Sequence, residues 1–292
     1  MPYDAKAELE KVRQYYNQDP LQKRFSALIT GETNAGKTYL LRTARRPIHI
    51  DSFDPGGTKC LRDLIKSGDV IADTRYEDED PFEPTAFAEW MKSVDLRFHT
   101  KYYDQFGTYC LDSATTFGEA VMGYGLAGKG RAGEIPQMRH DYLPQKTHMT
   151  NYIKKLMRLP CDFIMTGHLR EIRKVLSVDS KSGVVREDVK YRFYTVGQAV
   201  VTIPLLFDEI YVIIGQEGRE GPRREMLIDS LGTYIARSRL KMKGLLNSVE
   251  EPNIKNILRK SGYNANDKPS LTAATPIERK VISVDQENTQ II

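Results

Sequence analysis

The chain has 292 residues, of which 40% are hydrophobic and 28% charged, so it is long enough and apolar enough to bury a core of its own. Its 43 lysines and arginines stand against 39 aspartates and glutamates, and the net charge of +4 excludes a histone-like polycation. Three widely spaced cysteines, Cys60, Cys110 and Cys161, exclude a disulfide framework and a clustered zinc site, and favour a reducing cytoplasm.

The N-terminal end is predicted to form a short polar helix over residues 4–17. The helix closes before Pro20, because the residue ahead of a proline disfavours the helical backbone. Charged residues run through this stretch, unlike a signal peptide, and no apolar run approaches the roughly 18 residues of a membrane helix. We therefore expect residues 1–24 to be an N-terminal helical segment of a cytoplasmic protein with no membrane partner.

From about residue 25, short apolar runs alternate with longer helical patterns. Strands are predicted at residues 25–30, 47–51, 69–73, 108–113 and 161–167, and long helices at 84–106 and 147–158. Strands that alternate with helices are typical of βαβ units. The sequence therefore predicts an α/β fold with a mainly parallel central sheet flanked by helices.

After about residue 190 the pattern changes to short apolar runs joined by turns, with no long helix between them. Such runs are typical of hairpins or edge strands, so we expect antiparallel strands to complete a core over residues 25–245. Residues 246–292 are then a C-terminal extension. From about residue 262 the extension is polar and without periodicity, which predicts a largely flexible terminus.

The segment GETNAGKT, residues 31–38, matches the pattern G-x-x-x-x-G-K-[ST] in full. Such a loop between a strand and a helix turns backbone N–H groups toward phosphate oxygens. Lys37 would reach the β- and γ-phosphates of ATP, and Thr38 would place its hydroxyl on Mg²⁺. The predicted nucleotide-binding residues are Gly31, Glu32, Thr33, Asn34, Ala35, Gly36, Lys37, Thr38 and Tyr39.

Asp112 is the predicted partner of this P-loop. A P-loop needs a second carboxylate near the Mg²⁺, at the end of a neighbouring strand, and Asp112 ends the apolar run TYCLD. We expect its strand and the P-loop strand to be neighbours in the sheet, with Asp112 holding Mg²⁺ through water. The alternative is that this strand-end aspartate caps the helix that follows it.

With these residues, the chain resembles phage-encoded RecA-like P-loop ATPases, and among them the minimal-core recombinases of the Sak single-strand annealing group. The resemblance covers roughly residues 24–245. It depends on the P-loop, on TYCLDS at 108–113, on IMTGH at 164–168 and on the late run at 205–244. It implies an ATPase that oligomerises on single-stranded DNA and promotes annealing or strand exchange, often beside a single-strand-binding protein.

The resemblance also bears on the residue that activates water. Ser113 follows Asp112, where AAA+ machines, packaging motors and many helicases carry a second acid. This argues against those classes and for the RecA-like branch, in which the acid follows the strand after the P-loop helix. Asp51 and Asp54 lie there, and we favour Asp54 as the catalytic base. Either aspartate can instead be an ordinary turn residue.

His168 lies at the end of a predicted strand, where RecA-like proteins place a side chain that senses the γ-phosphate. A neutral imidazole donates one hydrogen bond and accepts another, which suits a sensor. A lone histidine is more often a structural residue, and that alternative stays open.

Two basic segments resemble in position the two DNA-binding loops of RecA-like proteins. Residues 125–160 carry seven basic and two acidic side chains, and residues 170–192 carry seven and four. Aromatic residues in or beside them can stack on bases, and attraction to phosphates would depend on salt. The alternative is a solvated surface. The candidate DNA-binding residues are Lys129, Arg131, Arg139, Arg170, Arg173, Lys174, Lys181 and Arg186.

Lys241 and Lys243 alternate along an extended basic segment and so share a face. They resemble the basic pair that RecA-like oligomers insert into the ATP site of the next subunit, with Arg239 as a rival. A positive charge there would stabilise the transition state, as an arginine finger does. A solvated strand face is the alternative.

The sequence thus favours an Mg²⁺- and ATP-dependent, RecA-like protein that binds single-stranded DNA as an oligomer in phage recombination or replication. Two other functions remain. One is a hexameric helicase or translocase on the same core. The other is an ATP-gated assembly factor, for which DNA is irrelevant.

Overall fold

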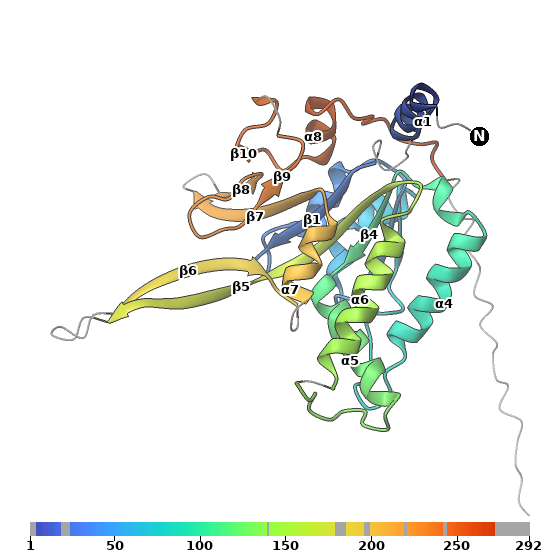
Figure 1. Ribbon diagram of the computed structural model, residues 1–292. Helices are drawn as coiled ribbons and strands as arrows, with labels where there is room; N and C mark the ends of the chain where they lie inside the picture. The colour runs from blue at the N-terminus through green and yellow to red at the C-terminus, as the bar shows by residue number, and fades with distance from the viewer. Residues whose placement is uncertain are drawn as a thin grey trace, which may run out of the picture.

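The computed structural model describes most of the chain and shows one central sheet with helices on both faces (Figure 1). The described residues are 4–18, 24–138, 140–178, 185–195, 199–218, 221–241 and 244–271. None of the helices in these ranges is long and apolar enough to cross a membrane.

The sheet is parallel at its centre and antiparallel toward one edge. Its strands are β1 Ser26–Gly31, β2 Ile48–Ser52, β3 Val70–Asp73, β4 Thr108–Asp112, β5 Asp162–Val178, β6 Val185–Phe193, β7 Glu209–Gly218, β8 Gly221–Leu227, β9 Arg237–Ser238 and β10 Val249–Glu250. They run in the order β10-β8-β7-β1-β5-β4-β2-β3, with β6 paired to β5 and β9 to β7. Pairs among β1–β5 and β1 with β7 are parallel, and β8, β9 and β10 pair antiparallel. The predicted fold class is confirmed.

One expectation about this sheet is wrong. The P-loop strand β1 and the Asp112 strand β4 are not neighbours, because β5 lies between them and pairs in parallel with both. The carboxyl ends of all three strands still meet at one edge of the sheet, so Asp112 and the P-loop stay close together.

The helices divide between the two faces of the sheet. They are α1 Ala5–Gln18, α2 Lys37–Leu40, α3 Arg62–Lys66, α4 Ala86–His99, α5 Ala114–Ala127, α6 Tyr142–Leu156, α7 Ala199–Thr202 and α8 Ile254–Lys260. Short 3₁₀ turns lie at Leu41–Thr43, Gly57–Leu61, Tyr102–Gln105 and Pro204–Leu206. One hydrophobic cluster lies under α4, α5, α6 and α7, and a second lies under α2, α3 and α8.

Successive side chains of the central strands enter opposite clusters. In β1, Leu28 packs in the first cluster while Ala27 and Ile29 pack in the second, and in β4 Leu111 and Cys110 divide in the same way. A sheet covered on both faces needs strands that are apolar at nearly every position. This is why the sequence shows short continuous apolar runs there.

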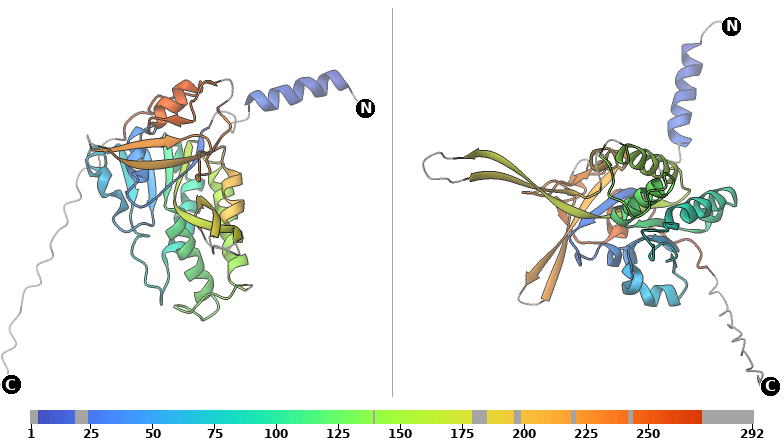
Figure 2. Two further views of the ribbon diagram at one scale, coloured as in Figure 1. Left: turned by 90° about the vertical axis from the view of Figure 1, so that its left-hand side faces the viewer. Right: turned by 90° about the horizontal axis from the view of Figure 1, so that it is seen from below.

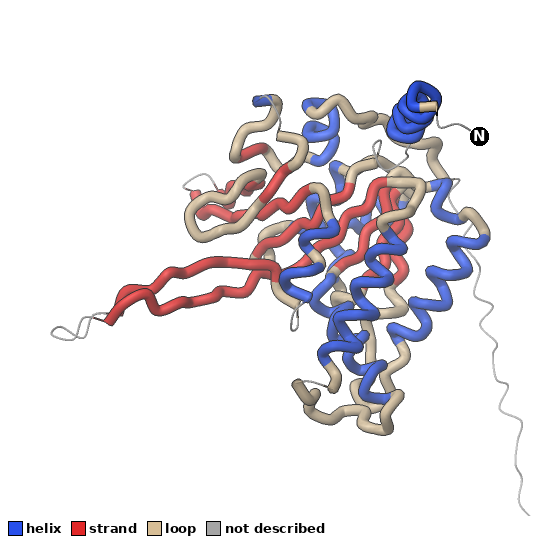
Figure 3. The backbone as a smooth tube through the Cα atoms, viewed as in Figure 1, coloured by secondary structure: helices blue, strands red, loops and turns tan. Residues whose placement is uncertain are grey.

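Two hairpins extend beyond the sheet. β5 and β6 continue as one long antiparallel ribbon, and Figure 3 shows both as unbroken strands well past the helices. β7 and β8 form a second ribbon, which diverges from the first (Figure 2). Both ribbons start from strands that flank β1, the strand that ends in the P-loop.

The ends of the chain differ in how they contact the core. Helix α1 has no buried residue and stands apart from the sheet (Figure 2). At the other end, Tyr263 and Ala265 pack on the second cluster, and the amide of Lys268 donates to the carbonyl oxygen of Arg46 at 2.8 Å. The flexible terminus expected from residue 262 therefore does not begin there. The rest of that prediction, residues 272–292, lies outside the described residues.

A buried polar cluster joins β2 to β4 and α4. The carboxylate of Asp51, which is 0% exposed, accepts hydrogen bonds from Trp90 Nε1 at 2.8 Å, Tyr109 Oη at 2.7 Å and Arg97 Nη1 at 2.8 Å. His49 Nε2 lies 2.8 Å from the same carboxylate. Burial by itself raises the pKa of Asp51, but the charges and hydrogen bonds of these partners outweigh it and the pKa is lowered.

This cluster predicts a loss of stability in Asp51→Ala. The substitution leaves the half-buried Arg97 guanidinium without its main partner, which we expect to lower the free energy of unfolding by about 3–5 kcal/mol in urea denaturation. Because the pKa of Asp51 is lowered by folding, its contribution is present at neutral pH and is lost as the pH falls below about 3.9. Asp95→Ala, which breaks a partly exposed pair with Lys155, should cost far less. Equal losses in the two variants would contradict the cluster's role.

Candidate active site

The P-loop connects β1 to α2 in the conformation that its glycines allow. Gly36 has a φ of +96° and Asn34 a φ of +66°, so the loop uses the left-handed region where a side chain is strained. Helix α2 begins at the next residue, Lys37. The loop therefore presents its N–H groups at a helix start, as phosphate binding requires.

Lys37 is buried inside this loop. Its Nζ donates to the carbonyl oxygens of Gly31 at 3.1 Å and Glu32 at 2.9 Å. Burial lowers the pKa of Lys37, and the nearby carboxylates of Asp112 and Asp54 oppose that shift. The backbone of the loop thus positions the ammonium group. When a nucleotide binds, the group can exchange these carbonyl oxygens for phosphate oxygens.

The carboxylate of Asp112 accepts hydrogen bonds from two hydroxyl groups, which belong to two different elements. Thr38 Oγ1, on α2, donates to its Oδ2 at 2.8 Å, and Thr166 Oγ1, on β5, donates to its Oδ1. Burial raises the pKa of Asp112, which these hydrogen bonds and the Lys37 charge partly offset.

The oxygen donors at this point fit magnesium. A hydroxyl and a carboxylate are hard ligands, and Mg²⁺ is commonly held by one or two carboxylates together with substrate phosphates. Within the described residues, no group of three or more acidic, histidine or cysteine side chains is arranged to hold a metal by itself. Thr38 and Asp112 would therefore hold the ion only together with a phosphate ligand.

A cavity of about 570 Å³ opens in front of the P-loop, large enough for a nucleotide. It is lined by Thr33, Asn34, Gly36, Lys37, Thr38, Tyr39, Asp54, Pro55, Gly56, Gly57, Lys59, Cys60, His168 and Arg224. The structure thus brings P-loop residues together with Asp54, which follows β2, and His168, which lies in β5.

The structure separates the two candidates for the catalytic base. Asp54 lines the cavity, and its Oδ1 accepts hydrogen bonds from Ser113 Oγ at 2.9 Å and Thr116 Oγ1 at 2.6 Å. Asp51 lies in the buried cluster described above and does not line the cavity. Of the two, Asp54 is the one that can meet a bound water.

His168 lies where β5 changes partners. It is the last residue of β5 in register with β1, opposite Gly31, and the next residue, Leu169, begins the pairing with β6. Burial and the charge of Lys37 lower the pKa of His168, so its imidazole is neutral at pH 7. The side chain lies in the cavity, at the base of the projecting hairpin.

Two contributions to this site were missed from the sequence. Thr166 is a hydroxyl within an apolar run, and its position two residues before His168 was the available signal. Arg224 comes from β8, and nothing local to the P-loop indicates that this distant strand folds back onto it.

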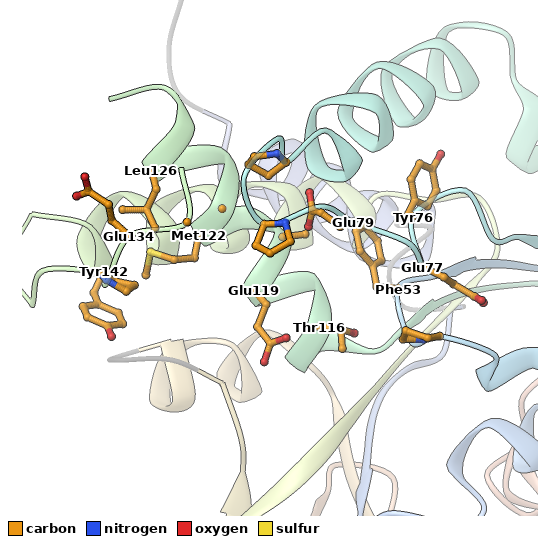
Figure 4. Close-up of a pocket in the computed structure, with 17 residues that line it drawn as sticks. Phe53, Tyr76, Glu77, Glu79, Thr116, Glu119, Met122, Leu126, Glu134 and Tyr142 are labelled. Atoms are coloured by element: carbon orange, nitrogen blue, oxygen red, sulfur yellow. The ribbon is translucent and has the colours of Figure 1, made fainter. Parts of the chain in front are cut away.

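A second cavity, of about 530 Å³, lies beyond Asp54 (Figure 4). Glu119 projects from α5 on one side of it, and Glu77 and Glu79 come from the connection between β3 and α4. Burial raises the pKa of Glu79 and of Glu119, the latter also beside Asp54. Together with Glu134 these carboxylates repel phosphates, so the nucleotide belongs in the first cavity.

Of the predicted trans-acting residues, Lys241 and its rival Arg239 do not line the cavity in front of the P-loop. Lys241 Nζ contacts Asp229 and donates to Ser248 Oγ at 2.9 Å, and Arg239 pairs with Asp208 at 2.7 Å. Lys243 lies outside the described residues.

Two side chains of the first basic segment are paired within it. Lys129 and Arg131 both bind the buried carboxylate of Asp141, the arginine at 2.9 Å. Arg131 also pairs with Glu134 at 2.7 Å. Arg139 lies outside the described residues. The two described candidates of this segment are therefore held by carboxylates between α5 and α6.

The second basic segment forms the β5–β6 hairpin (Figure 1). Arg170 lies 5.8 Å from the centre of the Tyr194 ring, and Arg173 pairs with Glu171 and, at 3.5 Å, with Glu187. Lys174 faces Asp188 in the register of the ribbon. Lys181 lies outside the described residues, and Arg186 is placed on β6 by its backbone alone.

A strand, a glycine loop, a helix and a carboxylate that meet in this way define a P-loop nucleotide-binding protein. A family model described as an AAA domain matches residues 23–240, and the chain belongs to this family. It is therefore a P-loop ATPase.

The remaining comparisons are distant. Among solved structures, the KaiC-like protein PH0186 from the archaeon Pyrococcus horikoshii OT3 aligns with 71% of this chain and 79% of its own, at 10% identity and a TM-score of 0.36. No curated protein matches the chain.

The geometry around Asp112 predicts the effect of Asp112→Asn. The amide keeps the size of the side chain but loses the charge that faces the ion, so we expect the Mg²⁺ concentration for half-maximal ATP hydrolysis to rise about 10- to 100-fold. Asp95→Asn, on the outer face of α4, is the matched control and should leave the Mg²⁺ dependence unchanged. An Asp112→Asn enzyme with wild-type Mg²⁺ dependence would show that Asp112 has no part in metal binding.

Proposed function

We propose that this chain is a RecA-like ATPase that binds single-stranded DNA as an oligomer and promotes annealing or strand exchange in phage recombination or replication. One observation carries the proposal. The strand β5 holds Thr166 against Asp112 and His168 in the ATP cavity, and it continues as one strand into a basic hairpin. A change of nucleotide at one end of this strand can therefore alter the other.

The ATP end of the strand supplies the hydrolysis. Water attacks the γ-phosphorus, the bond to the β–γ bridging oxygen breaks, and ADP and phosphate leave. Lys37 neutralises charge on the transferred group, and Asp54 accepts the water proton or orients the water. Bound Mg²⁺ supplies further charge neutralisation. His168, neutral and beside Lys37, donates or accepts a hydrogen bond according to whether the γ-phosphate is present.

The outer part of the strand supplies the DNA contacts. Arg173 pairs with two partly exposed carboxylates of the same ribbon, and such pairs are weak enough to exchange for DNA phosphates. Tyr191 stacks on Tyr234 at 5.0 Å between ring centres, and Tyr194 lies under Arg170. Aromatic rings beside basic groups are the usual means of binding single strands without sequence preference.

A second candidate is the ATP-gated assembly factor. The observation that favours it is the pairing of Lys129 and Arg131 with Asp141, which engages two of the candidate DNA-binding side chains within the protein. On that alternative the hairpin contacts protein rather than nucleic acid. A helicase on the same core would differ from both by directional unwinding of a duplex.

The test of the main proposal is ATP hydrolysis with and without single-stranded DNA. We expect DNA to stimulate hydrolysis, Lys37→Ala to abolish it, and the triple variant Arg170→Ala, Arg173→Ala, Lys174→Ala to lose the stimulation. The matched control neutralises three exposed basic residues elsewhere, Arg62, Lys66 and Lys92, and should keep it. Hydrolysis that ignores DNA in the wild type would favour the assembly factor.

The oligomer has its own test. If Lys243 reaches the ATP site of the next subunit, Lys243→Ala should bind ATP normally and lose turnover, because the group acts only on transition-state charge. Mixing this variant with Asp112→Asn protein should restore part of the turnover, since mixed assemblies contain some complete sites. Normal turnover of Lys243→Ala alone would remove the trans role.

A further inference from the structure

Arg224 enters the ATP cavity from a strand that the phosphate-binding motif does not include. Arg224 lies on β8, which pairs with β7, and β7 pairs with the P-loop strand β1. The backbone of Arg224 is therefore two strands away from β1, and its side chain extends to the P-loop. Its side chain lies against Gly36, where an added Cβ would be 2.8 Å from Arg224 Nε and 3.0 Å from Cδ. The guanidinium thus lies on the P-loop itself, beside Lys37.

Tyr39 is the group that holds this guanidinium. Its ring, 49% exposed, has the Arg224 guanidinium 5.6 Å from its centre and that of Arg42 at 5.3 Å. Arg42 is bound to Asp63, with one contact at 2.6 Å, and to the carbonyl oxygen of Cys60 at 3.2 Å. Arg42 is therefore fixed outside the cavity, whereas Arg224 has only the ring.

Among the described residues, no carboxylate lies within 4.0 Å of the Arg224 guanidinium. The neighbouring Arg223 differs, since its side chain is 79% exposed and lies 3.8 Å from Glu225. Successive residues of a strand point to opposite sides, so Arg223 carries the same charge on the side away from the cavity.

We propose that Arg224 binds the triphosphate of ATP from the same chain as the P-loop, and that Tyr39 positions it. The inference rests on the proposed ATPase. A planar guanidinium presents two N–H groups in a fixed fork that matches two phosphate oxygens, whereas the ammonium of the P-loop lysine acts as a compact point charge. Each site then has a phosphate-binding arginine of its own, in addition to any basic residue that a neighbouring subunit supplies.

The test measures equilibrium binding of Mg²⁺-ATP and of inorganic triphosphate to the full chain by calorimetry. Arg224→Ala should weaken both about tenfold or more, as expected for losing hydrogen bonds to a charged group. Arg224→Lys should recover part of the affinity, and Arg223→Ala should leave both affinities unchanged. Inorganic triphosphate has no base, so it separates phosphate binding from stacking on adenine.

The test of Tyr39 must distinguish positioning of Arg224 from a general effect of Tyr39 on the fold. Tyr39→Phe keeps the ring and should bind as the wild type does, while Tyr39→Leu should weaken binding in the wild type but have no further effect in Arg224→Ala. Wild-type affinities in Arg224→Ala, or a loss confined to ATP, would overturn the inference. If the wild type binds neither compound and Lys37→Ala changes nothing, the proposed ATPase itself fails.

Discussion

The carboxylate of Asp112 holds the active site together. It accepts a hydrogen bond from Thr38, on the P-loop helix α2, and another from Thr166, on β5. Since Asp112 itself ends β4, these two hydrogen bonds join three elements. A buried carboxylate is costly unless its oxygens are hydrogen-bonded. The three elements are therefore stable only in the arrangement that places a hydroxyl and a carboxylate at the position of the ion.

The remainder of the site is arranged around that point by the order of the strands. Because β5 lies between β1 and β4, Thr166 reaches Asp112 and His168 reaches the cavity in front of the P-loop. The end of β2 separates two aspartates three positions apart. Asp51 points into a buried cluster of aromatic and charged groups, and Asp54, beyond the strand end, meets the cavity.

Much of this could be predicted from the sequence, because the informative signals are local. The glycine loop and its lysine and threonine, the apolar runs of the sheet and Asp112 all depend on neighbours in the chain. The position of β5 between β1 and β4 could not, since burial on both faces makes the strands alike and leaves their order open. Arg224 could not either, because its contact with Gly36 forms only after β7 and β8 have paired. The contacts that the C-terminal extension makes with the core could not either, because Asp267 and Lys268 bind backbone groups of the core that are distant in the chain.

The two hairpins are both anchored beside β1, which limits the insertions and deletions that the fold can accept. Both start from strands that flank β1, and that strand has six residues, all buried. Inserting or removing one residue in β1 would reverse which side chains enter each cluster and would move the roots of both ribbons together. Their lengths can change freely at the outer ends, but their spacing at the base is fixed by the width of a single strand, about 4.8 Å on each side. The P-loop strand thus sets the distance between the two ribbons at their base, whatever their lengths.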